Sequence, residues 1–290
     1  MRIVRTKREL REALAPARRA GKSIGLVPTM GALHEGHLSL LRAARERCDV
    51  VVMSLFVNPT QFRPGEDLDI YPRDEARDAE LARAEGVDLI FAPATEEVYA
   101  EGFATTVEVG GGLTDVLDGD PARRGPEHFR GVTTVVAKLF NAVQPDVAFF
   151  GQKDGQQAIA IRRMVRDLDF PVEIVVVPTV READGLALSS RNAYLSPDER
   201  KRAAALSRAL RAAEAVAASG ETSMTVALDA ARNELAAAGI EPEYLEARDA
   251  DDLEPVESFN GRPVMVAVAA RIGSAHLIDN VVIGAGDQPA

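Results

Sequence analysis

Short apolar runs alternate with amphipathic segments along the chain as far as Thr179. The runs have the length and continuous hydrophobicity of strands buried in a parallel sheet, and they cover residues 24–27, 50–57, 87–91, 147–150 and 172–177. The segments between them have helical spacing, and they cover residues 37–47, 74–85, 132–143 and 156–168. This alternation predicts an α/β fold with a doubly wound, Rossmann-like parallel sheet, in which ligands bind beyond the carboxyl ends of the strands.

The two ends of the chain add to this pattern. Thr6 and Glu9 have the spacing of a capping box, which predicts a first helix that runs to Gly21. After Pro178 an irregular polar stretch leads into two Ala-rich helices between residues 198 and 238, and strand-like runs follow at 244–247, 264–270 and 276–283. We therefore expect a Rossmann-like domain over residues 1–179 and a smaller α+β domain over residues 180–290.

The amino-acid composition makes some classes of binding partner less favourable than others. The formal net charge of -11 and the sequence pI near 5.0 disfavour nucleic acid and anionic membrane surfaces. No run approaches about 18 apolar residues, and the N-terminus lacks the pattern of a signal peptide. Cys48 is the only cysteine, so a disulfide within the chain is impossible, and we expect a buried thiol in a cytoplasmic protein. An anionic ligand would need a local cluster of basic groups and backbone N–H donors.

The first apolar run is followed by a loop that leads directly into a helix, Pro28-Thr29-Met30-Gly31-Ala32-Leu33-His34-Glu35-Gly36-His37. The glycines let the backbone come close to a ligand, and the helix that follows offers unpaired N–H groups to a phosphate. His34 and His37 are three residues apart, so their imidazoles share one face of a helical turn and can reach the same phosphate.

A zinc pair and two surface histidines are the alternatives for His34 and His37. Zinc needs further ligands, but Cys48 is the only thiol and the other histidines are His128 and His276. Surface histidines would leave the flanking glycines unexplained.

Two further loops follow predicted strands, Asn58-Pro59-Thr60-Gln61-Phe62 and Gly151-Gln152-Lys153-Asp154-Gly155-Gln156-Gln157. The amides of the first suit hydroxyl and carboxylate recognition, although that segment taken alone is better explained as a polar turn. Lys153 is one of five lysines beside 29 arginines, and its ammonium could stabilise charge on a transferring phosphorus centre. A glycine turn with a solvated Lys–Asp pair explains the second loop equally well.

A fourth segment, Leu188-Ser189-Ser190-Arg191-Asn192, lies where the second domain is expected to begin. Two hydroxyls and a guanidinium can bind the outer phosphates of a triphosphate, although the motif alone is weak. A basic–aromatic cluster, His128-Phe129-Arg130, also precedes a predicted helix.

Taken together, these four segments resemble the pantothenate synthetase family in their order and spacing, over nearly the whole chain. The His-x-Gly-His element at residues 34–37 alone indicates only the wider nucleotidyltransferase group. The resemblance implies a two-step ligase in which the pantoate carboxylate attacks the α-phosphorus of Mg²⁺-ATP, and the amine of β-alanine then displaces AMP from pantoyl adenylate. It also implies a homodimer, for which the apolar runs near 51–57 and 107–109 could supply an edge or face.

The resemblance also assigns roles to residues. His34, His37, Lys153 and Arg191 would be catalytic, with His37 as the proton donor, and Gln61 would contact pantoate and β-alanine while Gln157 contacts pantoate. The residues implied to contact ATP are Met30, Gly31, Ala32, Leu33, His34, Glu35, Gly36, His37, Gly151, Gln152, Lys153, Asp154, Val180, Leu188, Ser189, Ser190 and Arg191. Leu188 stands where the family often has methionine, an apolar exchange of similar volume. The sequence names no protein ligand for Mg²⁺.

Three rival interpretations share parts of this pattern. Another adenylyl-transferring enzyme of the same fold, such as a nicotinamide-nucleotide adenylyltransferase, would have similar phosphate-binding loops, but the segments around Gln61 and Gln157 argue against it. A nucleotide-binding regulatory module would not need Lys153. A tRNA synthetase is disfavoured by the acidic charge and by the lack of an anticodon-binding domain.

Overall fold

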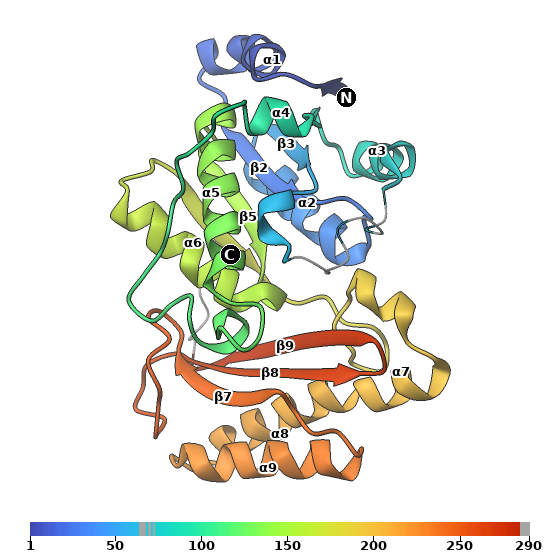
Figure 1. Cartoon of the computed structure of the whole chain (residues 1–290), viewed down its shortest axis with the longest axis vertical. Helices are drawn as coiled ribbons and strands as arrows, with labels where there is room; N and C mark the ends of the chain where they lie inside the picture. Colours follow the sequence, from blue (N-terminus) through green and yellow to red (C-terminus); the bar gives the residue numbers. More distant parts are fainter. Residues whose placement is uncertain (64–67, 69–70, 72, 285–290) are drawn as a thin grey trace. The chain divides into compact units, whose positions relative to one another are not determined.

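The computed structural model of the chain (Figure 1) describes residues 1–63, 68, 71 and 73–284. The chain forms two compact units. The first unit comprises Met1–Gly151 and Ala160–Val177, and the second comprises Gln152–Ile159 and Pro178–Ala290. A functional division at residue 179, with the second part closing over ATP, stays a proposal.

The first unit contains a six-stranded, all-parallel sheet in the order β1-β4-β3-β2-β5-β6. The strands are β1 (Arg2–Val4), β2 (Ile24–Thr29), β3 (Val50–Leu55), β4 (Leu89–Phe91), β5 (Val147–Gly151) and β6 (Glu173–Val177). The strand order reverses direction between β2 and β5, which are neighbours in the sheet. In sheets of this kind ligands bind at such a reversal, beyond the carboxyl ends of the strands. The first and third loops leave the sheet at those two ends.

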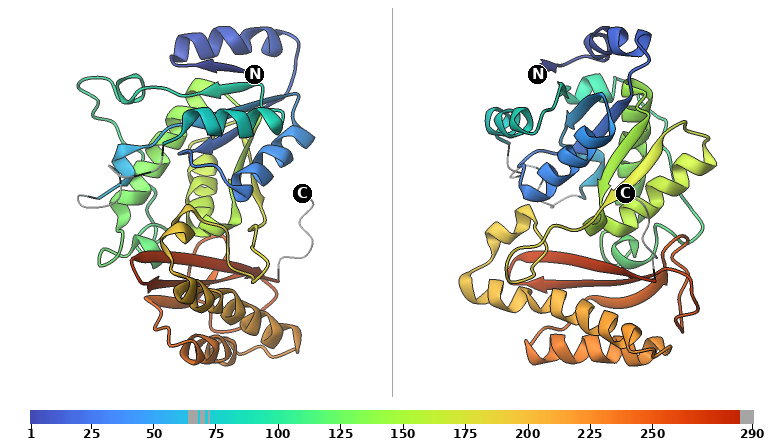
Figure 2. Two further views of the ribbon diagram at one scale, coloured as in Figure 1. Left: turned by 90° about the vertical axis from the view of Figure 1, so that its right-hand side faces the viewer. Right: turned by 180° about the vertical axis from the view of Figure 1, so that it is seen from behind.

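Helices lie on both faces of this sheet (Figure 2), which confirms the Rossmann-like prediction. They are α1 (Lys7–Arg19), α2 (Glu35–Arg47), α3 (Glu75–Ala84), α4 (Thr95–Val98), α5 (Pro126–Val143) and α6 (Gly155–Asp167), with 3₁₀ turns η1 (Pro59–Gln61) and η2 (Leu117–Gly119). The 3₁₀ turn η3 (Gln152–Asp154) and α6 as far as Ile159 belong to the second unit. The predicted capping box between Thr6 and Glu9 opens α1. None of the helices that the structure describes is both long and apolar enough to span a membrane.

The second unit has its own sheet and core. Its antiparallel strands β7 (Tyr244–Asp249), β8 (Val264–Ile272) and β9 (Ala275–Ile283) are joined in that order, with helices α7 (Pro197–Ala203), α8 (Ala205–Ala218) and α9 (Met224–Ala237) and the 3₁₀ helix η4 (Ser190–Tyr194). Every second residue of β8 from Val264 to Ile272 joins Leu206 and Leu210 of α8 in one buried cluster. The smaller α+β fold expected from the sequence is therefore confirmed.

Several elements differ from the sequence-based predictions. β1 was missed because it is short and two of its three residues are exposed. The helix predicted from residue 132 begins at Pro126, which suits a first helical position because proline lacks an N–H. Three helices, not two, lie between residues 197 and 237, since Ala204 separates α7 from α8. β3 lies inside the sheet, between β4 and β2, so it has no free edge for pairing with a second copy.

Cys48 lies in the apolar core between the sheet and α2. Its side chain packs so close to β2 that a Cβ on Gly25 would stand 2.8 Å from the Cys48 sulfur. The residue is 5% exposed, and burial raises the pKa of its thiol because the thiolate would lose its hydration. At a given pH the native protein therefore holds less thiolate than an unfolded chain does.

We predict that Cys48 reacts with a thiol reagent at pH 8 at least about tenfold more slowly in the native protein than in denaturant, since the reagent attacks the thiolate. The colorimetric release of thionitrobenzoate measures both rates, and a single cysteine makes the stoichiometry one per chain. Rapid, complete reaction of the native protein would contradict the burial of this residue.

Candidate active site

The loop after β2 is fixed by a buried carboxylate. Asp78 of α3 is 1% exposed, and its two oxygens accept hydrogen bonds from the backbone N–H groups of Ala32 (2.9 Å) and Leu33 (2.8 Å). Gly31 and Ala32 have φ angles of 90° and 53°, in the left-handed region. A side chain at Gly31 would also collide with Asp78, because its Cβ would stand 2.9 Å from Oδ2. The Gly31–Leu33 turn is thus held in one conformation.

The two histidines lie side by side at the start of α2. His34 is the N-cap, and its Nδ1 accepts a hydrogen bond from the Gly36 N–H at 3.2 Å. The His37 Nδ1 accepts one from the His34 N–H at 3.4 Å, and the ring centroids are 4.2 Å apart. Because both Nδ1 atoms act as acceptors, each neutral ring carries its proton on Nε2. Both histidines can therefore present an Nε2–H donor to an anion, as their spacing predicts.

Gly36 is required by the position of the His34 ring. A Cβ at residue 36 would lie 2.9 Å from Cε1 and 3.0 Å from Nδ1 of His34. Real Cβ atoms do not come so close to a ring, so any larger residue would displace the imidazole. The glycine in the His-x-Gly-His element therefore makes room for the N-cap histidine.

Glu35 stands between these residues, and its carboxylate is bound to another residue of α2. Arg42 donates hydrogen bonds to both Glu35 oxygens, and this pairing holds the pKa of the Glu35 carboxyl below its usual range. What Glu35 can offer an anion is its backbone N–H in the first turn of the helix.

Gln61 lies in the short turn after β3 and is held on several sides. Its Nε2 donates to the sulfur of Met30 at 3.0 Å, and its Oε1 accepts from the Asn58 amide at 3.1 Å. Asn58 is 1% exposed, and its Oδ1 also accepts from the Tyr99 hydroxyl at 2.8 Å. Burial raises the pKa of Tyr99, so the phenol stays a hydrogen-bond donor at neutral pH.

Helix α5 supports the same turn from the other side. The Asn58 amide donates to the Gly131 carbonyl, and a Cβ on Gly131 would lie 2.4 Å from the Thr60 carbonyl oxygen. The Nδ1 of His128 lies 2.7 Å from the Gln61 carbonyl oxygen. Gln61 is therefore placed by contacts from its own turn and from two other stretches of the first unit, the loop after β2 and helix α5.

The remaining predicted residues belong to the second unit, apart from Gly151 at the end of β5. Lys153 lies in η3, with its ammonium 3.7 Å from a carboxylate oxygen of Asp154. Gln157 lies in the first turn of α6. Among the described residues of the chain, no three His, Cys, Asp or Glu side chains gather as they would around a metal ion.

The segment from Val180 to Leu188 forms a hairpin-like loop. The Leu188 N–H donates to the Val180 carbonyl at 3.0 Å, and Arg181 pairs with Ala187 through an isolated bridge. Beyond the hairpin, the Ser189 hydroxyl caps η4 by accepting from the Arg191 N–H at 3.2 Å. Two predicted ATP contacts, Val180 and Leu188, are therefore brought side by side.

A family model described as pantoate-beta-alanine ligase matches residues 2–282 of the chain. The chain belongs to this family. It is 57% identical to the pantothenate synthetase of Moorella thermoacetica, over 99% of this chain and 100% of that protein. It is 55% identical to pantothenate synthetase 1 of Bradyrhizobium diazoefficiens, over 98% of both chains.

Solved structures of the pantoate-beta-alanine ligase family agree with this assignment. The pantothenate synthetase of Thermus thermophilus superposes with a TM-score of 0.90 at 52% identity, over 97% of this chain and 99% of that one. The ligase of Francisella tularensis, solved in complex with beta-gamma ATP and β-alanine, superposes with a TM-score of 0.79 at 31% identity, over 99% of both chains.

Sequence reasoning missed the residues that hold the loops of the candidate site in place. Asp78 and Tyr99 drew no attention because each lies far along the chain from the loop that it supports. Asn58 was noted only as part of a polar turn. A charged residue on the buried face of α3 was the one available signal for Asp78, since Ala79 and Ala82 of that helix are also buried.

We predict that Gly36→Ala lowers turnover on the order of 100-fold with little change in the thermal midpoint, since the added methyl displaces the His34 ring while alanine suits a helix. Steady-state pantothenate formation and a melting curve are the two measurements.

Gly110→Ala is the matched control, because a Cβ at Gly110 would meet nothing within 4 Å. Equal activity of the two variants would contradict the role given to Gly36.

Proposed function

We propose that this protein joins pantoate to β-alanine by activating the pantoate carboxylate as its adenylate, with the residues of the four loops in the roles given below. The match of the pantoate-beta-alanine ligase model over residues 2–282 is the observation that carries this proposal. As a member of that family the protein is an ATP-dependent ligase that forms an amide bond. ATP is its nucleotide substrate, in keeping with the ATP complex of the Francisella tularensis relative.

The reaction has two displacement steps. In the first, a carboxylate oxygen of pantoate attacks the α-phosphorus of ATP, and the bond to the bridging oxygen breaks to release pyrophosphate. In the second, the amine of β-alanine attacks the acyl carbon, loses a proton and expels AMP. Adenylation supplies the leaving group that a bare carboxylate lacks, so the protein needs no covalent nucleophile. Its contribution is positioning and the stabilisation of developing charge.

In this proposal the residues of the first unit bind the phosphates of ATP and the pantoate. The Nε2–H groups of His34 and His37 donate to phosphate oxygens, and His37 supplies a proton to the departing pyrophosphate. Gln61 binds pantoate and borders the β-alanine position, which suits an amide already fixed by Met30 and Asn58. Residues Met30 to His37 contact ATP through the turn that Asp78 holds.

The residues of the second unit stabilise charge. Lys153 balances the charge that develops on the α-phosphate, and Gln157 contacts pantoate. Ser189, Ser190 and Arg191 bind the β- and γ-phosphates. Further ATP contacts come from Gly151, Gln152, Asp154, Val180 and Leu188.

Magnesium enters with the nucleotide in this proposal. The described residues form no cluster of three acidic or histidine ligands, so they do not fit a metal cage made by the protein. Mg²⁺ commonly keeps several waters and binds through substrate phosphates. Such an ion neutralises phosphate charge, while the side chains above hold the nucleotide itself.

A homodimer and a cytoplasmic location stay proposals. The exposed edges of the first unit's sheet are β1 and β6, so an edge-to-edge dimer of that unit would use one of these strands rather than β3. Light scattering on the purified protein gives the mass of the assembly directly.

We predict that the protein releases pyrophosphate from ATP and Mg²⁺ when pantoate is present, and forms AMP and pantothenate in equal amounts when β-alanine is added. A coupled pyrophosphate assay with a panel of small carboxylates measures the first step, and chromatography measures the products. If pyrophosphate is released with nicotinamide mononucleotide but not with pantoate, the protein is instead an adenylyltransferase.

The Lys153→Ala variant, measured in the same assay, tests the role of the Lys153 ammonium. We expect it to lose turnover while ATP binding, followed by calorimetry, persists, because the ammonium acts on charge that grows in the transition state. Full turnover of this variant would remove Lys153 from the chemistry.

A further inference from the structure

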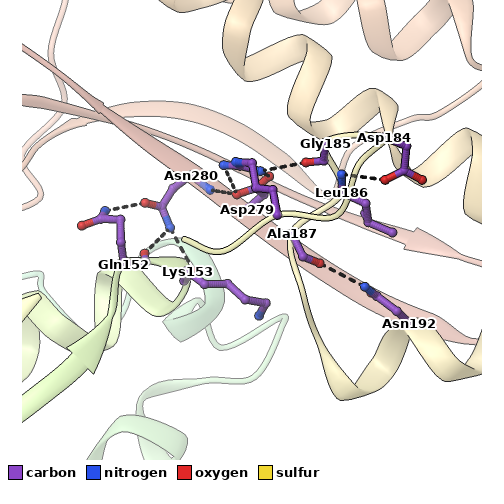
Figure 3. Close-up of polar contacts among 10 residues, drawn as sticks. Gln152, Lys153, Asp184, Gly185, Leu186, Ala187, Asn192, Asp279 and Asn280 are labelled. Atoms are coloured by element: carbon purple, nitrogen blue, oxygen red, sulfur yellow. Dashed lines mark hydrogen bonds and ion pairs between the residues drawn. The ribbon is translucent and has the colours of Figure 1, made fainter. Parts of the chain in front are cut away.

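Two consecutive buried residues of β9, Asp279 and Asn280, each bind a different segment of the second unit (Figure 3). The Asp279 side chain is 2% exposed, and Asn280 is 5% exposed. Neighbouring residues of a strand point to opposite faces of a sheet, so one point on β9 can reach two segments. Both segments carry residues that the proposed function places on ATP.

Asn280 binds the turn that carries Lys153. Its Nδ2 donates to the carbonyl oxygens of Gln152 and Lys153, both at 2.9 Å, and its Oδ1 accepts from the Gln152 side-chain amide at 2.6 Å. The fit leaves no spare room, because a Cβ on Gly155 would lie 3.1 Å from either end of the Asn280 amide. Only an amide can donate and accept in this way at one position.

Asp279 binds the hairpin between Val180 and Leu188. Its two carboxylate oxygens accept a bidentate pair from the Arg181 guanidinium, at 2.6 and 3.0 Å. The same guanidinium donates to the Gly185 carbonyl at 3.2 Å, so it spans the hairpin from one side to the other. Because the pair is bidentate and has low exposure, it fixes both the orientation of the Arg181 side chain and its distance from Asp279.

The position of Asp279 is unusual for a residue of its type. Every second residue of β9 faces the helices of the second unit, and the others in this row are apolar: Ala275 and Leu277 are buried in the core, and Val281 and Ile283 pack against it. An acid in such a row costs stability unless it is paired, and an apolar residue would serve packing at least as well. This row therefore contains a carboxylate whose clearest use is to hold Arg181.

The two side chains are also coupled to each other. Oδ1 of Asp279 accepts from the backbone N–H of Asn280 at 2.8 Å, in addition to its bond with Arg181. A shift of the Arg181 hairpin would therefore be transmitted to the residue that holds the Lys153 turn. The Arg181 hairpin and the Lys153 turn are therefore both bound to the same two neighbouring residues of β9.

We propose that Asp279 and Asn280 are positioning residues that set the Lys153 turn and the Val180–Arg191 loop at a fixed spacing for one ATP molecule. This inference rests on the proposed function. Neither side chain needs to touch the nucleotide, because each acts through the backbone or the guanidinium that it binds.

The decisive variants keep size and change only the bonding. Asn280→Asp replaces the amide donor with a carboxylate oxygen that faces two carbonyl oxygens, and Asp279→Asn removes the charge that pairs with Arg181. Asp249→Asn is the matched control for the second change, since Asp249 is 9% exposed on β7 and binds Arg262 and the Asp251 N–H. Leu277→Ala controls for general loosening of β9.

We expect kcat/KM for ATP to fall on the order of 100-fold in both decisive variants, because a displacement of about 1 Å can cost that much. The KM for β-alanine should stay unchanged, since its proposed contact, Gln61, belongs to the first unit. Hydrogen exchange measured by mass spectrometry should rise at residues 152–158 in Asn280→Asp and at residues 180–192 in Asp279→Asn. The two controls should lower the melting temperature without this pattern.

Wild-type kcat/KM for ATP in both decisive variants would overturn the inference, as would an equal loss in Leu277→Ala or Asp249→Asn. Absence of pantothenate synthesis by the wild-type protein would instead overturn the proposed function. The hydrogen-exchange pattern distinguishes failure of the inference from failure of the proposed function. It reports whether Asp279 and Asn280 hold their two segments, whichever reaction the protein catalyses.

Discussion

Where a strand ends, its sheet no longer supplies partners for the backbone N–H and C=O groups of the loop that follows. Buried groups of this kind must still be hydrogen-bonded. In this protein polar side chains provide bonds that tie these turns to elements distant in the sequence. Asp78 accepts from the turn after β2, Asn58 joins the turn after β3 to α5, and Asn280 donates to the turn after β5. Each of the three turns is thereby tied to a second element of the fold, namely α3, α5 or β9.

This arrangement suits a reaction that depends on placement more than on reactive side chains. The chain is acidic overall, with a formal charge of -11, so an anionic nucleotide must be attracted by local donors. In the proposed function these donors are two neighbouring imidazoles at a helix N-terminus and a lysine in a short turn. Because Nδ1 of both imidazoles accepts from a backbone N–H, each neutral ring carries its proton on Nε2, the atom that donates to phosphate in the proposed function.

Local elements could be predicted well from the sequence, whereas the supporting contacts could not. Continuous apolar runs located β2 to β5, because strands buried on both faces need no polar residues, and the partly buried edge strand β6 has a similar run. The spacing of His34 and His37 also predicted their contact, since helical geometry is local. Asp78 and Asn280 could not be paired with their loops, because such pairing depends on the packing of remote elements. The sequence does contain one indication of the contact on β9, because Asp279 interrupts a row of apolar residues in that strand.

The transfer of ¹⁸O from the pantoate carboxylate is the most direct test of activation by adenylation. The protein would be incubated with carboxylate-labelled pantoate, unlabelled ATP, Mg²⁺ and β-alanine, and the nucleotide products examined by mass spectrometry. Attack on the α-phosphorus places one labelled oxygen in AMP and leaves pyrophosphate unlabelled. Label in inorganic phosphate together with ADP would show attack on the γ-phosphorus and would contradict the adenylate.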